Sequence, residues 1–275
     1  MVNINGTLFD ELPPEIEAVQ RALYYGDTLF ETVRVFGGSL PLWPAHWERL
    51  RTGSRLLDYD WPEEWSSDFF LRAIQTVLPG PQARVRITVW RSPGGLYCPD
   101  NNIPQYLVRA QALHGDCYEW QPLNMSVGVS ESVRLPIDAY SGLKTLNAAR
   151  YVAAALEAKR AGWDDALLLN ANDHICEATG SNVFWWEDDH LCTPPLSDGP
   201  VTGTFRNLLL RAASVKGISV HQKSLSKKAL LQAEEVFLTN AVQGIRPVRY
   251  FEEKEYRCSK TKELFEETVS FLKHL

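Results

Sequence analysis

The sequence predicts an α+β fold arranged in two domains, and three observations support this prediction. The 275 residues are enough for two modest domains that each bury a core. In both halves of the chain, segments that alternate like strands are mixed with segments that have the apolar spacing of helices. Turn-forming residues gather in residues 114–142, which we interpret as a connection between domains of residues 1–113 and 143–275.

In the N-terminal half, turn signals delimit the expected elements. Asn5-Gly6 follows a first short strand, and Gly37-Gly38 follows the run FETVRVF, which alternates like a strand. Pro44 lies where a helix with regularly spaced apolar residues should begin. The expected strands span residues 2–5, 30–36, 83–90 and 105–112, and the expected helices span residues 44–59 and about 63–77.

The C-terminal half has clearer helix boundaries. An Ala-rich helix should end before Gly162, because glycine suits the left-handed conformation that often follows a helix. A second helix should follow Gly203 and end before Gly217. The expected helices span residues 146–161, 204–215 and 261–275, and the expected strands span 125–129 (within the connection), 165–169, 183–186, 191–193 and 235–239.

Composition restricts the classes of function. The formal net charge of −6 argues against a nucleic-acid groove, which needs a basic face. Residues 1–15 are polar and turn-rich, unlike a signal peptide, and no run approaches the roughly 20 apolar residues of a membrane helix. The five cysteines are scattered without a C-x-x-C pair, which favours reduced thiols in the cytoplasm over a disulfide framework or a metal site.

Lys144 is the first candidate for chemistry. It lies in SGLKTLNAARY, after a glycine-bearing turn and just ahead of a predicted helix. The positive end of the helix dipole would lower the pKa of a lysine there and favour its neutral, nucleophilic form. Taken alone, a solvated lysine near a helix start is the simpler interpretation.

Three further residues suggest a ligand site. Glu177, in HICEATGSNVFWW, would present a carboxylate at the end of a strand, although Gly, Ser and Asn after it could form an ordinary turn. Gly203 directly precedes a helix whose free amides could bind an anion, and Arg49 on the early helix could supply a matching cation. An ordinary helix start and a solvated arginine are the alternatives.

The order of these segments is more specific than any one of them. HWERL, LKTLN, EATGSN and TPPLSDG-x-x-x-G-x-x-R follow one another in a way that resembles the class IV aminotransferases, which are the fold-type IV pyridoxal-phosphate enzymes. YYGDTLFETVRV and EEVFLTNAVQGIRPV extend the resemblance over nearly the whole chain. The resemblance implies pyridoxal 5'-phosphate as cofactor, bound between a smaller N-terminal α/β domain and a larger C-terminal mixed α/β domain.

The resemblance also implies roles for single residues. Lys144 would bind the cofactor as a Schiff base and later act as acid and base, and Glu177 would pair with the pyridine nitrogen. Arg49 would bind the phosphate together with the first amides of the helix after Gly203, and Val201 would pack against the ring. The residues expected to bind the cofactor are Arg49, Lys144, Glu177, Val201, Gly203, Thr204 and Phe205.

Departures from the transaminase patterns bear on the member of the family. D-amino-acid transaminases carry a tyrosine where this chain has Phe30, and a histidine after the arginine that matches Arg91. Branched-chain transaminases carry hydroxyls where this chain has Ala148 and the pair Asn240-Ala241. The triplet Thr239-Asn240-Ala241, K-x-L-N and Thr32 instead resemble aminodeoxychorismate lyase, with a branched-chain or other L-amino-acid transaminase that uses 2-oxoglutarate as the alternative.

On the substrate side, Tyr25, Arg34 and Arg86 resemble the residues of the branched-chain transaminases. Alternation along the strand places Phe30, Thr32 and Arg34 on one face, where Thr32 would act with Lys144 in catalysis. Arg34, Arg86 and Arg91 are candidates for two substrate carboxylates, although Arg86 and Arg91 could be solvated residues at a strand edge. The residues expected to bind the substrate are Tyr25, Phe30, Arg34, Arg86 and Asn240.

The resemblance implies a homodimer with active sites near the interface. Trp43, Trp47 and Tyr97 are aromatic residues that could bury such a surface. The expected partner is a small amino substrate with carboxylate groups. A binding protein that had lost catalysis would lack Lys144 or Glu177, and both are present.

Overall fold

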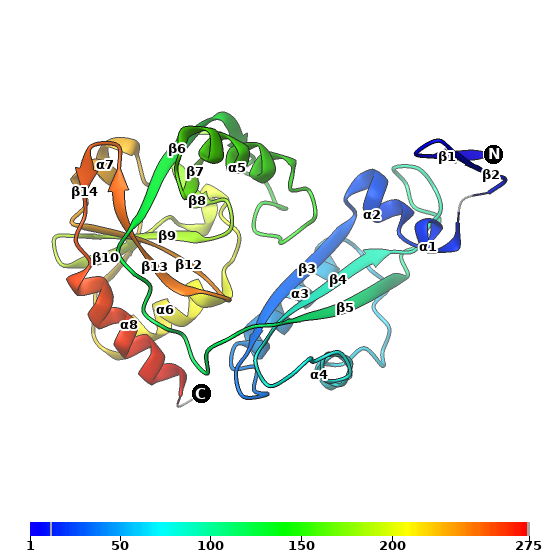
Figure 1. The fold of residues 1–275 in the computed structure, drawn as a ribbon, viewed down its shortest axis with the longest axis horizontal. Helices are drawn as coiled ribbons and strands as arrows, with labels where there is room; N and C mark the ends of the chain where they lie inside the picture. Colours follow the sequence, from blue (N-terminus) through cyan, green and yellow to red (C-terminus); the bar gives the residue numbers. More distant parts are fainter. Residues whose placement is uncertain (12, 274–275) are drawn as a thin grey trace.

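The computed structural model describes residues 1–11 and 13–273. Helices and strands are mixed in two bodies that lie side by side, one made by the first half of the chain and one by the second (Figure 1). The α+β prediction is therefore confirmed. Among the described residues, no helix combines the length and apolarity needed to cross a membrane.

The N-terminal body is built on a three-stranded antiparallel sheet. Its elements are β1 (Val2–Ile4), β2 (Thr7–Phe9), α1 (Pro14–Glu17), α2 (Gln20–Tyr25), β3 (Thr28–Val35), α3 (Trp43–Leu56), α4 (Ser67–Gln75), β4 (Ala83–Arg91) and β5 (Pro104–Ala112). Strand β4 lies between β3 and β5, and β1 pairs with β2 as a separate hairpin. Helices α3 and α4 pack on one face of the sheet, where Val33, Val85, Ile87 and Phe70 belong to a shared core. The other face is left for the site.

The C-terminal body contains a larger sheet. Its strands are β6 (Met125–Leu135), β7 (Asp165–Asn170), β8 (Ile175–Ala178), β9 (Asn182–Glu187), β10 (His190–Thr193), β11 (Val220–Gln222), β12 (Glu235–Asn240), β13 (Gly244–Phe251) and β14 (Lys254–Glu255). The order is β11-β10-β9-β12-β13-β6-β7-β8, and β14 pairs with β13. Strand β8 also pairs with β9, so six of these strands close into a ring around an apolar core.

Helices surround this sheet (Figure 1). They are α5 (Ala149–Ala161), α6 (Thr204–Val215), α7 (Lys227–Gln232) and α8 (Ser259–Leu272), with a short 3-10 helix at Leu196–Asp198. Helix α6 has the predicted bounds, and Gly162 ends α5 with a φ of 76°, the left-handed conformation expected there. The predicted helix 261–275 begins at Ser259, and its final positions, 274–275, lie outside the described residues.

Several elements, among them β13, are absent from the sequence-based expectation, and β6 and α5 differ from it in ways that matter for the site. The strand predicted at 125–129 continues to Leu135 and pairs in parallel with β7 and β13, so this part of the predicted connection is built into the larger sheet. The second half of this strand, SESVR, is polar, so the sequence pattern does not predict it. The apolar–polar alternation typical of a strand ends where the register shifts between Val129 and Arg134. Helix α5 begins at Ala149 and not at 146, which leaves Lys144 outside the helices and strands, five positions ahead of α5.

Candidate active site

A cavity of about 1420 Å³ lies between the two bodies. One wall is the open face of the three-stranded sheet, and the others come from the segments before α5, around β8 and before α6. The tertiary structure thus brings together positions from both halves of the chain. The cavity-lining residues include all of those assigned to a site from the sequence, namely Tyr25, Phe30, Thr32, Arg34, Arg49, Arg86, Lys144, Glu177, Val201, Gly203, Thr204, Phe205 and Asn240.

Lys144 is held against the small sheet by its own backbone. Its carbonyl accepts a hydrogen bond of 2.9 Å from the amide of Phe30, and its side-chain nitrogen lies 4.6 Å from the centre of the Phe30 ring. Burial, reinforced by the charge of Arg49, lowers the pKa of Lys144 to about 8. The shift expected from the sequence is present, but removal from water is its main cause, since α5 begins only at Ala149.

Glu177 lies on β8 and is almost fully buried. Its Oε1 accepts a hydrogen bond of 2.7 Å from the Tyr151 hydroxyl, and its Oε2 accepts one of 3.0 Å from the amide of Val201. Burial raises the pKa of Glu177 to about 7, although both hydrogen bonds and the charge of Lys144 act in the opposite direction. A cationic N–H beside this carboxylate would stabilise its charged form.

Tyr151 is a contact that the sequence analysis missed. It lies on the first turn of α5, and its phenol contacts Glu177, which comes from a different element. Burial and the Glu177 charge raise the pKa of Tyr151 far above its usual range, so the phenol stays protonated and remains a hydrogen-bond donor. The only signal in the sequence is an aromatic residue seven positions after Lys144, which does not by itself indicate a contact.

The N-terminus of α6 forms another part of the cavity wall. Gly203 is the residue before the helix, and a Cβ at this position would collide with the side-chain oxygen of Asn182. Asn182 also donates a hydrogen bond of 2.9 Å to the carbonyl of Val201, which fixes the approach to the helix. The first amides of α6, at Thr204 and Phe205, have no acceptor within the helix and line the cavity.

Arg49 is fixed by a buried carboxylate that the sequence analysis did not identify. Its Nε donates a hydrogen bond of 2.8 Å to Glu31, its Nη2 donates a second one to the same carboxylate, and its Nη1 donates one of 2.7 Å to the carbonyl of Thr202. Burial alone would raise the pKa of Glu31, but the charges and hydrogen bonds of Arg49 and His46 lower it to about 2.

His46 extends this network to α6. Its Nδ1 lies 2.6 Å from Glu31, and its Nε2 lies 3.4 Å from the Thr204 hydroxyl. Burial lowers the pKa of His46 below its usual value, which favours the neutral ring. The spacing of His46 and Arg49 on one helix face was the available signal, because residues three apart on a helix are neighbours.

The open face of the small sheet carries cations and one hydroxyl. Phe30, Thr32 and Arg34 line the cavity, as the strand alternation predicts. Thr32 is paired with Arg86 on β4, whose guanidinium lies 3.9 Å from the centre of the Phe30 ring. Within residues 1–11 and 13–273, the Arg86 guanidinium has no hydrogen-bond or ion-pair partner. Arg34 donates a hydrogen bond of 3.1 Å to the carbonyl of Gly115.

Arg91 and Trp43 do not lie where the sequence analysis expected them. Arg91 also lines the cavity, but it is 6% exposed at the end of the central strand β4. It forms an ion pair of 2.8 Å with Asp27 and donates to the Leu57 carbonyl and the Asn102 side chain, so it is not a solvated strand-edge residue. Trp43 is 5% exposed in the core under the small sheet, so it cannot bury a dimer surface.

These groups fit a charged pyridine phosphate. A lysine with a lowered pKa can bond to an aldehyde carbon, and Glu177 offers a buried carboxylate to a ring N–H. The amide-bearing terminus of α6 and Arg49 suit a phosphate. Asn240 also lines the cavity, and its side-chain oxygen accepts hydrogen bonds from the backbone amides of Val242 and Gln243.

Comparison with known proteins agrees with this geometry. The family model for amino-transferase class IV matches residues 28–251. The chain is 30% identical over 236 residues to the aminodeoxychorismate lyase of Vibrio harveyi, covering 83% of this chain and 84% of the relative. It is 29% identical over 254 residues to a putative branched-chain-amino-acid aminotransferase of Methanocaldococcus jannaschii, covering 90% and 86%.

A solved structure extends the comparison to the fold. A putative 4-amino-4-deoxychorismate lyase from Legionella pneumophila superposes with a TM-score of 0.80 and 26% identity, covering 96% of each chain. Members of the matched family use pyridoxal 5'-phosphate, the cofactor for which the site has suitable groups. The chain therefore belongs to the class IV aminotransferases and is a pyridoxal-phosphate-dependent enzyme.

Proposed function

We propose that this enzyme is a 4-amino-4-deoxychorismate lyase, which releases pyruvate and leaves 4-aminobenzoate. The supporting observation is the cationic wall of the cavity, where Arg34, Arg84 and Arg86 come from two adjacent strands. A substrate with two carboxylates would pair with these guanidinium groups. A branched aliphatic substrate side chain would instead cover these guanidinium groups without offering them an anion or a hydrogen-bond acceptor, and burying an unpaired charge is costly.

Each residue has a proposed part in this reaction. Lys144 would hold the cofactor and, once the substrate amine has displaced it, its free amine would accept the proton of the carbon that bears the amino group, since its pKa of about 8 leaves part of it neutral near pH 7. Glu177 would pair with the ring nitrogen of the cofactor, Val201 would pack against its ring, and Arg49 would bind its phosphate with the amides that follow Gly203; all of them line the cavity. When bound, pyridoxal phosphate supplies the electron sink for proton removal.

The remaining residues act on the substrate. Thr32 donates a hydrogen bond to the departing enolpyruvyl oxygen, and Arg34 and Arg86 bind the carboxylates. Tyr25 and Asn240 border the same space and limit its size. The six-membered ring of the substrate becomes aromatic as pyruvate leaves, which makes the reaction favourable.

The second candidate is a branched-chain or other L-amino-acid transaminase that uses 2-oxoglutarate. The similarity to the putative Methanocaldococcus jannaschii aminotransferase, which covers 90% of this chain, favours it. The holoenzyme should be incubated with aminodeoxychorismate and, separately, with leucine plus 2-oxoglutarate. Formation of pyruvate and 4-aminobenzoate supports the lyase, whereas glutamate from leucine without any pyruvate from aminodeoxychorismate rejects it.

Replacing Thr32 with valine tests the proposed hydrogen-bond donor. Valine keeps the β-branched shape that the strand favours but has no hydroxyl. We expect 4-aminobenzoate formation to fall roughly 10²-fold, which is typical of a lost acid–base partner, with an unchanged cofactor absorption spectrum. Thr32→Ser keeps the hydroxyl and should retain most of the activity. Unchanged pyruvate release by Thr32→Val would remove Thr32 from the mechanism.

We further propose that the enzyme acts as a homodimer in the cytoplasm. Support comes from apolar side chains that are exposed on β5 and on the loop before it, where Leu96, Tyr97, Ile103 and Leu107 are each more than half exposed. Apolar side chains exposed in one region of a surface are often covered by a partner. Light scattering at micromolar concentration should give twice the monomer mass, and a fully active monomer would contradict the proposal.

A further inference from the structure

The loop that joins β4 to β5 borders the cavity. It spans residues 92–103, and its Tyr97 and Pro99 line the cavity wall. The ring centre of Tyr97 lies 5.5 Å from that of Tyr25, so two tyrosines from different elements meet there. The side chains of Leu96 and Tyr97 are largely exposed, which gives the loop few apolar contacts. Within one subunit, its conformation therefore depends on polar contacts at its base.

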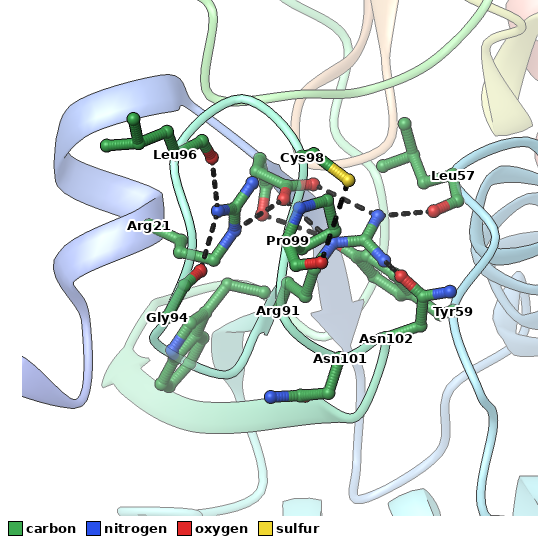
Figure 2. Close-up of polar contacts among 12 residues, drawn as sticks. Arg21, Leu57, Tyr59, Arg91, Gly94, Leu96, Cys98, Pro99, Asn101 and Asn102 are labelled. Carbon is green, nitrogen blue, oxygen red and sulfur yellow. Dashed lines mark hydrogen bonds and ion pairs between the residues drawn. The ribbon is translucent and has the colours of Figure 1, made fainter.

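Arg21 on α2 holds the backbone of this loop. Its Nη1 donates hydrogen bonds of 2.9 Å to the carbonyl of Gly94 and 2.7 Å to the carbonyl of Leu96 (Figure 2). The same guanidinium lies 4.8 Å from the centre of the Tyr25 ring. Arg21 is only 3% exposed, so these contacts are shielded from water. One side chain thus contacts both the loop and a residue of the cavity wall.

Asp27 joins Arg21 to a second buried arginine. Its Oδ2 accepts hydrogen bonds of 3.1 Å from Arg21 and 2.8 Å from Arg91. Arg91 also donates to the Leu57 carbonyl and to the side chain of Asn102 at the far end of the loop (Figure 2). Two cations this deeply buried need a shared anion. We name Arg21, Asp27 and Arg91 the loop clamp.

The loop clamp connects the loop to the strand that carries the proposed hydrogen-bond donor. Asp27 directly precedes β3, on which Phe30 and Thr32 line the cavity. Tyr59, whose hydroxyl donates a hydrogen bond of 3.1 Å to the Asp27 carbonyl, fixes the backbone there, and its ring lies under the Arg91 guanidinium. A change in the loop clamp would therefore move the loop relative to this strand.

We propose that the loop clamp is a positioning device for the substrate, which holds the 92–103 loop and its Tyr97 where they close one side of the cavity. The loop clamp acts through the loop and not on the reacting atoms, so its loss weakens substrate binding more than it slows the chemical steps. The proposal rests on the proposed function only for the identity of the substrate.

The variant Arg21→Lys tests the proposal. Lysine keeps the charge next to Asp27, but its single ammonium cannot reproduce the planar fork that reaches Asp27 and two loop carbonyls together. We expect KM to rise roughly tenfold, the effect of about one lost charge-assisted hydrogen bond, with kcat within about twofold. Hydrogen exchange of the amides in residues 92–103 should be at least about tenfold faster. Arg72→Lys on the exposed face of α4 is the matched control and should change neither quantity.

A second variant reaches the loop without replacing any of the three residues of the loop clamp. Gly94 has a φ of +117°, and a Cβ there would lie 2.7 Å from the Asp100 carboxylate. Gly94→Ala should therefore disturb the loop and raise KM in the same way, even if Arg21→Lys does not fold.

The outcomes separate the two proposals. Unchanged loop exchange in both variants overturns the loop clamp, and faster exchange with unchanged KM overturns its positioning role. KM is measured with whichever substrate the holoenzyme converts. If leucine and not aminodeoxychorismate reacts, the lyase proposal fails while the loop clamp is still tested.

Discussion

The variant Lys144→Ala is expected to lose nearly all activity and the yellow colour of the holoenzyme. Lys144 is the buried amine of the cavity, and its pKa of about 8 supplies a neutral nucleophile near physiological pH. Without it, the cofactor has no covalent bond to the protein, and proton transfer at the substrate carbon loses its base. We expect turnover to fall about 10⁴-fold, at the upper end for a lost acid–base group.

Visible absorption and borohydride reduction measure the covalent bond directly. The wild-type holoenzyme should absorb near the violet edge, and borohydride should make the bond permanent at one lysine. Lys159→Ala, on the exposed side of α5, should behave like the wild type. A Lys144→Ala protein that still gives a reducible adduct at a single site would show that another residue holds the cofactor.

The variant Glu177→Gln should keep the cofactor but lose about 10³-fold in turnover, the range for a lost electrostatic stabiliser in a buried site. Glutamine has nearly the shape of glutamate, and its oxygen can still accept a hydrogen bond from Tyr151 or Val201. It carries no charge, so a protonated ring nitrogen would lose its counter-charge in a place that water does not reach.

Cofactor titration and steady-state turnover separate binding from chemistry in this variant. The variant Tyr151→Phe removes one hydrogen bond to the carboxylate but keeps the charge, so it should cost about tenfold or less, as one charge-assisted hydrogen bond would. Near-wild-type turnover by Glu177→Gln would mean that Glu177 only shapes the turn after β8.

The sequence by itself determined local structure where the boundary residues and the apolar spacing indicate the same element. Helix α6 has its predicted bounds because Gly203 and Gly217 delimit a run with helical apolar spacing. Strand β3 alternates as predicted, with Glu31, Val33 and Val35 directed into the body and Phe30, Thr32 and Arg34 directed into the cavity. The order of the motifs was enough to indicate the family, which the comparisons confirm.

Only the tertiary structure decided which polar groups pair. Alternation along β4 places Arg91 and Arg86 on opposite faces, but only the folded chain shows that Arg91 is buried with Asp27 and that Arg86 faces the cavity. The partners of Arg91 come from three separate segments, and a local sequence pattern does not indicate contacts between segments so far apart in the chain. The partners of Glu31 are likewise set by tertiary structure. A carboxylate on the core face of a strand is costly to bury, and in the fold Arg49 and His46 of α3 reach it.

The length of strand β6 and the pKa of Lys144 were also decided by tertiary structure and not by local sequence. β6 is a long strand because β7 and β13 pair with it, although its second half is polar in sequence. The pKa of Lys144 falls mainly because both bodies exclude water from its side chain, and the field of α5 predicted from the sequence is not needed. Burial and long-range pairing depend on the packing of distant segments, so they appear only when the chain is folded.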